Sequence, residues 1–356
     1  MASLRDVALL RLAAQRLVGE AHPTAADAAR WATCTQAQDL PGALVSLALR
    51  TTERTVAGVD AALDAGAVVR SWPMRGTLHL VAAEDLRWLL AVGPPRVATA
   101  AAKRRADLGI DAAVLDSARA ATVAALEGGG RLSRDRLMTV WDEAGVSTAG
   151  QRGAHLFGAL AVEGLVCLGP LTGRRQQVVL VDEWVAPTPA RDRDEAVQEW
   201  ALRYFRGHGP ATERDFAWWS GLTLTEARRA AAVARDELAP LVAGGVEHLM
   251  DPDTPARLDG CRREARGVLL VPGFDELVLG YGDRAAVVPP EHSDRVAPGG
   301  NGMFLATVVS AGTAVATWRR PTSRAATEPD VTPFGSLTKP VAAAVRRRWA
   351  AYPRPA

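Results

Sequence analysis

Two uncharged amides stand two residues apart near the start of the chain, at Gln36 and Gln38, with the carboxylate of Asp39 beside the second. An amide oxygen accepts a hydrogen bond from water and presents partial negative charge, so such a pair can position a nucleophile and stabilise a cation. Side chains two apart face each other poorly on a helix, so the amides converge only where the backbone is extended, turned or at a helix end. The alternative interpretation is two solvated glutamines at a helix boundary, with Asp39 as a helix cap.

Local patterns predict helices on both sides of this motif and a β-hairpin after them. Thr24 can cap the preceding helix, and Pro41 suits the first turn of the following one. The predicted elements are helices over residues 3–18, 25–33, 41–49 and 55–65, then strands over 68–72 and 77–81. Three short helices followed by a hairpin are the plan of a winged helix.

The same plan recurs further along the chain. The second set comprises a helical connector over 83–106, helices over 115–126, 134–144 and 148–164, and strands at 165–168 and 177–181. Residues 210–219 then repeat the pattern of residues 23–31, in which a proline and a threonine cap precede a short helix that ends near a tryptophan. We interpret these three segments as an internal repeat.

From residue 267 onward the pattern changes to short β-rich runs separated by Gly, Pro and Asp. The expected elements are strands over 268–271, 277–280, 285–288, 304–309 and 313–318, and a final amphipathic helix over 337–351. The loop at 289–302 is rich in proline and glycine, and we expect it to be stiff and to lie outside the core. Loops on a rigid sheet often carry function.

Together these patterns predict an α+β fold that is mainly helical, with three tandem winged-helix motifs in a curved array and a C-terminal β-rich subdomain. The first winged helix contains the glutamine motif and the helical connector. The predicted domains are residues 1–106, 107–190, 191–266 and 267–356.

Composition narrows the class of protein. The chain has 356 residues, 48% hydrophobic and 23% charged, with a net charge of +2. No apolar run approaches the roughly 20 residues that a membrane span needs, and the N-terminus lacks the pattern of a secretion signal, so we expect a cytoplasmic protein. Three distant cysteines fit neither a disulfide framework nor a zinc ribbon. The basic residues are nearly all arginine, which suits phosphate contacts.

Other chemistries find little support in the sequence. The six histidines lack metal-ligand spacing, the glycines near residue 300 form no phosphate cradle, and the two lysines, Lys103 and Lys339, do not stand in apolar pockets that would favour a Schiff base. We therefore expect no metal and no cofactor.

Three longer motifs carry a resemblance to a known family. They are RSWPMRGTLHL at residues 70–80, PGFDE through YGDR at 272–284, and NGMF through TWRR at 301–320. In this order they resemble the tandem winged-helix DNA glycosylases of the AlkZ and YcaQ type. The resemblance implies that Gln36 and Gln38 form the catalytic Gln-x-Gln motif of the AlkZ-like branch, since the YcaQ branch is expected to carry Asp at the second position.

That resemblance implies a monofunctional DNA glycosylase that acts on N7-alkylated purines, including bulky adducts or interstrand crosslinks made by a genotoxic natural product. Such an enzyme would serve DNA repair or antibiotic self-resistance. An N7-alkylated purine is already cationic and leaves without protonation, so two amides can suffice without a strong acid. We expect Gln38 to hold the water and Gln36 to face the sugar or the lesion.

The resemblance also implies that duplex DNA carrying alkylated purines is the partner. The sequence leaves the oligomeric state open, and we take a monomer as the default. A hairpin within the 289–302 loop would probe the minor groove. The expected DNA contacts are Arg50, Arg54, Arg75, His292, Arg295 and Asn301. The expected pocket residues are Trp31, Trp72, Thr77, His79 and Asp275, although the tryptophans and His79 fit a core role about as well.

Two other functions remain open at this point. The first is a non-enzymatic winged-helix DNA-binding protein or transcriptional regulator, because most winged helices are regulators and a fold alone does not define a function. The second is a resistance protein that sequesters a genotoxic drug.

Overall fold

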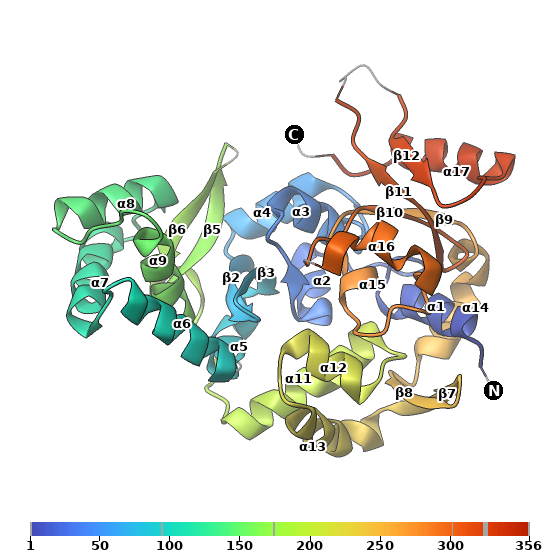
Figure 1. The fold of residues 1–356 in the computed structure, drawn as a ribbon, viewed down its shortest axis with the longest axis horizontal. Helices are drawn as coiled ribbons and strands as arrows, with labels where there is room; N and C mark the ends of the chain where they lie inside the picture. The colour runs from blue at the N-terminus through green and yellow to red at the C-terminus, as the bar shows by residue number, and fades with distance from the viewer. Residues whose placement is uncertain (1, 94, 174, 301, 323–326, 355–356) are drawn as a thin grey trace. The chain divides into compact units, whose positions relative to one another are not determined.

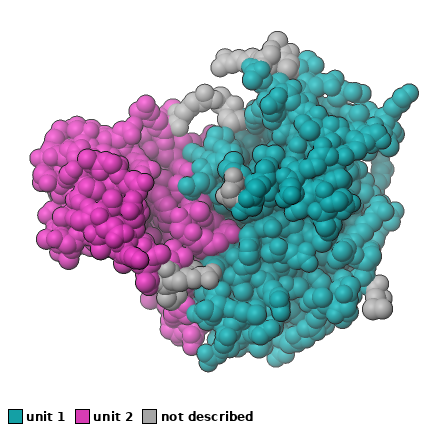
Figure 2. Space-filling model, in the orientation of Figure 1, with its two compact units in different colours: residues 1–58, 197–356 teal, residues 59–196 magenta. Residues whose placement is uncertain are grey.

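The computed structural model describes residues 2–93, 95–173, 175–300, 302–322 and 327–354 (Figure 1). The chain divides into two compact units (Figure 2). Unit 1 comprises residues 1–58 and 197–356, and unit 2 comprises residues 59–196. One boundary falls within the helix α4 (Val56–Asp64), inside the segment predicted as the first winged helix. The number and limits of the winged-helix motifs, and their curved array, stay predictions.

Capped helices account for much of unit 1. The Thr24 hydroxyl accepts a hydrogen bond from the Asp27 N–H and starts α2, and Thr212 forms a reciprocal capping box with Asp215 at the start of α12. The helices wholly within this unit are α1 (Leu4–Ala14), α2 (Ala25–Ala32), α3 (Leu40–Ala48), α12 (Glu213–Ser220), α13 (Leu224–Ala234), α14 (Thr254–Ala265), α15 (Glu276–Leu279), α16 (Ser293–Val296) and α17 (Lys339–Ala350). The helix α11 (Arg193–His208) begins in unit 2 and continues into unit 1.

An antiparallel sheet forms the C-terminal part of unit 1, in the order β12 (Asp330–Pro333), β11 (Thr313–Arg319), β10 (Thr307–Ser310) and β9 (Val268–Val271). Thr307 of β10 lies opposite Val271 on one side and Thr317 on the other. Alternation along β11 buries Ala314, Ala316 and Trp318. Figure 1 shows α1 beside α14, and apolar side chains of both helices join β9 and β10 in one core. A separate hairpin pairs β7 (Ala239–Ala243) with β8 (Val246–Met250).

Two of the predicted C-terminal strands are wrong. Residues 277–280 belong to α15 and the residue after it, because the Asp275 carboxylate accepts the Leu277 N–H and caps a helical turn. Residues 285–288 form a turn, since the Arg284 carbonyl accepts the N–H groups of Val287 and Val288. The first run and residues 286–288 of the second are buried, and a short apolar run alone does not distinguish a strand from a buried turn.

The 289–302 segment also differs from the expectation of a hairpin outside the core. Its described residues form helical turns at Pro290–His292, Ser293–Val296 and Pro298–Gly300. Pro290 suits the first position of such a turn, and Val296 is buried in the core of unit 1. Asn301 lies outside the described residues.

Unit 2 contains both predicted wings as β-hairpins. The strands β2 (Val68–Met74) and β3 (Thr77–Ala82) pair with each other, as do β5 (Val166–Thr172) and β6 (Arg175–Leu180). These strands adjoin β4 (Leu132–Ser133) in the order β3, β2, β5, β6, β4. The unit's helices are α5 (Leu86–Ala91), α6 (Pro95–Asp107), α7 (Ala112–Leu126), α8 (Arg134–Glu143), α9 (Arg152–Val162) and α10 (Val181–Trp184).

The prediction of a mainly helical α+β fold is confirmed. Among the described residues, no helix combines the length and apolar character needed to cross a membrane.

Candidate active site

The Gln-x-Gln motif lies between two helices, with Gln36 on extended backbone and Gln38 in a bend. The helix α2 ends at Ala32, the strand β1 (Thr35–Gln36) follows, and α3 begins at Leu40. Side chains two residues apart can converge on backbone of this kind, as the prediction for Gln36 and Gln38 required. Thr33, which joins α2 to the motif, has φ of 62°. That conformation is strained for a β-branched residue, and such strain tends to gather at functional sites.

The two amides occupy different environments. Gln36 is buried, with 7% of its surface exposed, whereas Gln38 is exposed. The Gln38 N–H donates to the side-chain oxygen Oε1 of Gln36 at 3.3 Å, which ties the buried amide to the turn that carries the exposed one. The structure therefore links the Gln38 main chain to the Gln36 side chain, and Gln38 is the exposed residue of the two.

A buried carboxylate lies directly behind Gln36. The Gln36 N–H donates to Oε1 of Glu276 at 3.1 Å, and Glu276 is only 1% exposed. Its other oxygen, Oε2, accepts from Nε1 of Trp219 at 2.8 Å and lies 3.3 Å from Nε2 of His208. The first turn of α15, the end of α12 and the end of α11 thus meet at the back of the glutamine motif.

The next residue, Asp275, fixes the same turn to the helices around it. Both its carboxylate oxygens accept from Arg50, at 2.9 and 3.0 Å, and one also accepts from the Ser46 hydroxyl at 2.6 Å. The pKa of Arg50 is raised, because the charge and hydrogen bonds of Asp275 outweigh the opposing effect of burial. Gln15 completes the set by accepting from Arg50 at 2.6 Å.

This arrangement corrects two site predictions. Arg50 is 3% exposed and its guanidinium is taken up by Asp275, Ser46 and Gln15, so it holds the fold together and is not available to grip a phosphate. Asp275 is 1% exposed and is saturated by the same contacts, so it supports the site from behind and does not line an open pocket.

Asp39 takes the expected position but not the expected contact. It stands at the N-cap of α3, yet its side chain makes no capping hydrogen bond and is exposed. A residue with a Cβ atom at position 42 would place that atom 2.6 Å from Oδ2 of Asp39. Gly42 therefore leaves room for the Asp39 carboxylate.

The remaining predicted residues of unit 1 are spread over its surface. Arg54 is one-third exposed and lies 3.8 Å from Glu264. Arg295 donates to the carbonyls of Pro333 and Phe334, and His292 packs against the Phe334 ring at 4.7 Å. These contacts attach the 289–302 segment to the end of β12.

Trp31 lines a cavity of about 480 Å³ with His22, Arg30 and five other residues, and neither glutamine is among them. The guanidinium carbons of Arg16 and Arg257 lie 5.2 and 5.4 Å from the centre of its ring, and its Nε1 donates to the Ala14 carbonyl. The role of Trp31 in a lesion pocket stays a prediction.

Four predicted residues belong to the β2–β3 hairpin of unit 2. Trp72 packs edge-on against Phe157 at 5.4 Å, beside the core of that unit. His79 is fully buried, and its Nδ1 lies 2.9 Å from the Thr77 carbonyl, as for a core histidine. Arg75 lies at the hairpin turn with φ of 54°. Their roles toward DNA or a lesion stay predictions.

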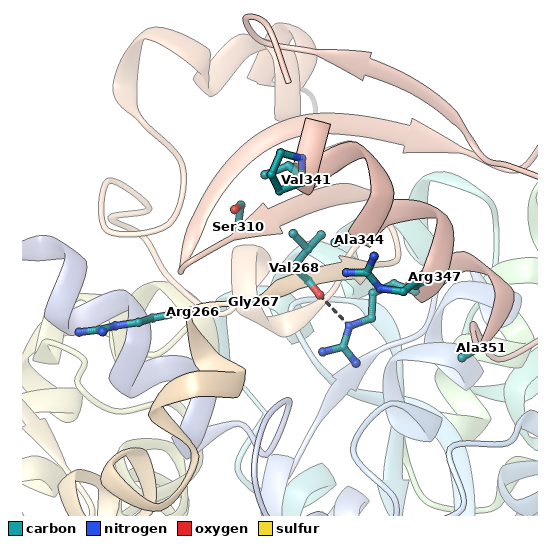
Figure 3. A pocket seen from close by; sticks show the side chains of 10 residues that line it. Arg266, Gly267, Val268, Ser310, Val341, Ala344, Arg347 and Ala351 are labelled. Carbon is teal, nitrogen blue, oxygen red and sulfur yellow. Dashed lines mark hydrogen bonds between the residues drawn. The ribbon is translucent and has the colours of Figure 1, made fainter. Parts of the chain in front are cut away.

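A second cavity of about 480 Å³ opens between the start of β9 and one face of α17 (Figure 3). Arg266, Arg347 and Arg348 line it together with Ser310. Within the described part of the chain, none of these arginines pairs with a carboxylate, and Arg348 donates to the Val268 carbonyl at 2.9 Å. Figure 3 shows Arg347 extending from α17, so the cavity presents positive charge.

Sequence reasoning did not assign roles to Glu276, Trp219 or His208. Glu276 lies within the PGFDE motif, and the apolar run at 277–279 that directly follows it is the signal that marks a buried, partnered carboxylate. No comparable signal points to Trp219 and His208. In the residues that the structure describes, no three His, Cys, Asp or Glu side chains gather so as to hold a metal ion.

The family follows from comparison with known proteins. Residues 29–354, which include both glutamines and the Asp275–Glu276 turn, match the model of the AlkZ-like DNA glycosylases. The chain belongs to this family. It is therefore a DNA glycosylase that acts on DNA, and the non-enzymatic regulator is set aside.

Comparison by sequence and comparison by structure each give a match from Streptomyces sahachiroi. The chain is 28% identical over 333 residues to an "Interstrand DNA cross-link repair glycosylase", covering 89% of this chain and 88% of that protein. The solved structure of the DNA glycosylase AlkZ from the same organism matches with a TM-score of 0.76 at 24% identity, covering 99% of this chain and 98% of the other. The structural likeness shows that the two chains share a fold.

Proposed function

We propose that this glycosylase hydrolyses the N-glycosidic bond of N7-alkylated purines, with Gln36 and Gln38 as its catalytic residues. The observation that carries the proposal is that the motif presents an exposed glutamine, Gln38, whose main-chain N–H donates to the side chain of the buried Gln36. Such a site suits a leaving group that needs no protonation.

The reaction can be written with this site. The bond between C1′ of the sugar and N9 of the purine breaks, and its electrons neutralise the positive charge of the alkylated ring. A water molecule held by the Gln38 amide adds to C1′, and its proton passes to solvent. The amide oxygens also face the transient positive charge on the sugar.

The proposed substrates include bulky adducts and interstrand crosslinks of a genotoxic natural product. Support comes from the relative named as a crosslink repair glycosylase and from the exposure of Gln38, which leaves the motif accessible to a lesion that stays in the duplex. We further propose that the enzyme acts as a monomer without a metal and has no lyase step. The unpaired arginines beside α17 support contact with DNA phosphates.

Two substrates test the substrate class. The first is a duplex with one N7-linked interstrand crosslink, and the second is a duplex with one N7-alkylguanine monoadduct. The enzyme is expected to release single strands from the first, seen on a denaturing gel, and to leave abasic sites in the second. Activity on the monoadduct alone would restrict the proposal to monoadducts, and activity on neither would overturn it.

A further inference from the structure

The cavity beside α17 combines positive charge with an apolar floor. The floor is built from one residue of β9 and three of α17, namely Val268, Pro340, Val341 and Ala344. Figure 3 shows Val268 and Ala344 between Arg266 on one side and Arg347 on the other, and both of these arginines are exposed. The cavity therefore offers apolar contact and positive charge to the same ligand.

The charge in this cavity comes from two separate helices. Arginines in the last turn of a helix often do no more than balance the helix dipole. Here Arg266 follows the end of α14 and Arg347 lies near the end of α17, and both line one cavity. Neither forms an ion pair within the described part of the chain, whereas the neighbouring Arg346 lies 3.8 Å from Glu328. The two charges are therefore available to a ligand.

The lining fits a sugar phosphate. The planar guanidinium group of arginine matches the geometry of a phosphate, and the Ser310 hydroxyl can donate a further hydrogen bond. The apolar floor suits the C–H face of a deoxyribose. A volume of about 480 Å³ is large enough for one sugar with its phosphate. Since the protein is a DNA glycosylase, the backbone of its DNA is the source of such a group.

The strand β9 connects this cavity to the glutamine motif. Val268 lines the cavity at the start of β9, and Glu276, further along the same chain, accepts the Gln36 N–H at 3.1 Å. The chain from 268 to 276 spans at most about 28 Å, because one extended residue covers no more than about 3.5 Å. One turn of duplex DNA is about 35 Å long. The cavity and the motif can thus contact one duplex within about a single turn.

We propose that this cavity binds one phosphate and the adjoining deoxyribose of the DNA backbone, within about one helical turn of the excised base and on one side of it. The inference rests on the proposed function, because the glutamines define where excision occurs. A phosphate contact fixes the register of a protein on DNA without reading its sequence. The cavity would therefore hold the duplex in place while the lesion meets Gln38.

Replacing single phosphates tests this position. Each phosphate within one turn of the lesion is replaced in turn by an uncharged methylphosphonate, on both strands. The lesion is an N7-methylguanine on a 2′-fluoro sugar, which resists excision because fluorine disfavours positive charge on the sugar. Wild type should lose about 3- to 10-fold in affinity at one or two adjacent phosphates on one side of the lesion.

Arg347→Gln should lose less than about 2-fold at those same phosphates, because the contact that they made is already absent. Arg347 is exposed, so the variant should fold as wild type does. Arg346→Gln is the matched control and should keep the wild-type pattern. Equal losses in wild type and Arg347→Gln at every phosphate overturn the proposal, and they are also the result expected if the cavity takes only a free anion.

A second pair of variants tests the floor. Ala344→Glu places a carboxylate in the cavity, and it should weaken binding and abolish the sensitivity to the same phosphates. Ala350→Glu makes the same change at an exposed position of the same helix that does not line the cavity, so it should keep the sensitivity. Identical patterns in these two variants would show that only the net charge of α17 matters, and would overturn the proposal.

Wild-type excision of N7-methylguanine on an ordinary deoxyribose is measured alongside. If excision occurs but the phosphate pattern does not depend on Arg347, only the role of the cavity fails. Absence of excision on every N7 adduct overturns the proposed function itself.

Discussion

The main-chain N–H of Gln38 donates a hydrogen bond to the side-chain oxygen of Gln36 at 3.3 Å. One amide oxygen is thereby held against the turn, and the other amide extends from the same turn into solvent. Within the proposed site this makes Gln38 the better placed of the two to hold the attacking water.

Gln38→Ala should therefore lower kcat by about 100-fold or more, with DNA affinity within a few-fold of wild type, because only the transition state loses a contact. Asp39→Asn is the neighbouring control. Its side chain is exposed and makes no capping bond, so excision should stay within a few-fold. Single-turnover excision measures both. If Asp39→Asn abolishes excision and Gln38→Ala does not, the carboxylate is the catalytic group.

The Arg50–Asp275 pair should contribute to stability. Removing one partner leaves a buried charge unpaired, so Asp275→Asn should lower the free energy of unfolding by about 3 kcal/mol. Arg54→Gln breaks a pair at 3.8 Å whose side chains are each about one-third exposed, and it should cost about 0.5 kcal/mol or less. Urea denaturation gives both values. Equal, small effects would show that the buried pair is not structural.

His22 should make stability depend on pH. Burial, and next the nearby Arg16 charge, lower its pKa from 6.5 to about 4. The unfolded chain therefore binds a proton that the folded chain does not, and the free energy of unfolding falls as pH drops from about 6.5 towards 4. The loss should be about 1–2 kcal/mol, less than the full shift implies, because the ring is partly solvent-screened.

His22→Phe keeps an aromatic ring beside Trp31 and removes the titration. Its urea midpoint should change less than that of wild type between pH 7.5 and pH 5. The same dependence in both proteins would assign the effect to other groups.

The arginine-lined cavity beside α17 should contribute to DNA affinity. Arg347→Gln removes one unpaired cation and should weaken binding to undamaged duplex and lower the salt slope by about 1. Arg346→Gln is the control, because it removes the same charge from the same helix. Arg346 already lies 3.8 Å from Glu328, so this variant should lower DNA affinity less. Fluorescence anisotropy over a range of salt concentrations separates the two. Identical behaviour of both variants would remove this cavity from the DNA-binding surface.

Local signals predicted the parts of the fold that local interactions build. The Thr24 cap, the hairpin turn after Met74 and the presence of a second hairpin all depend on residues within a few positions of one another. The first strand of that second hairpin continues to Thr172, beyond the end predicted at residue 168. The strand predicted at 277–280 failed because one side chain, Asp275, caps a helical turn that the apolar pattern does not show.

The contacts inside the candidate site could not be predicted from the sequence, because they join residues that are far apart in the chain. Arg50 and Asp275 are 225 positions apart, and Gln36 and Glu276 are 240 apart. An arginine near a catalytic motif has the same sequence signature whether it grips a phosphate or is buried in an ion pair. Only the fold shows which partner it meets, and here the partner is Asp275.

The most direct test of the catalytic glutamines uses duplex DNA with a single N7-alkylguanine, treated with enzyme and then with mild base. Wild type should give strand breaks at the lesion, whereas the double variant Gln36→Ala/Gln38→Ala should give none while binding the DNA within a few-fold of wild type. Breaks with the double variant at the wild-type rate would contradict the assignment of the glutamines as the catalytic residues.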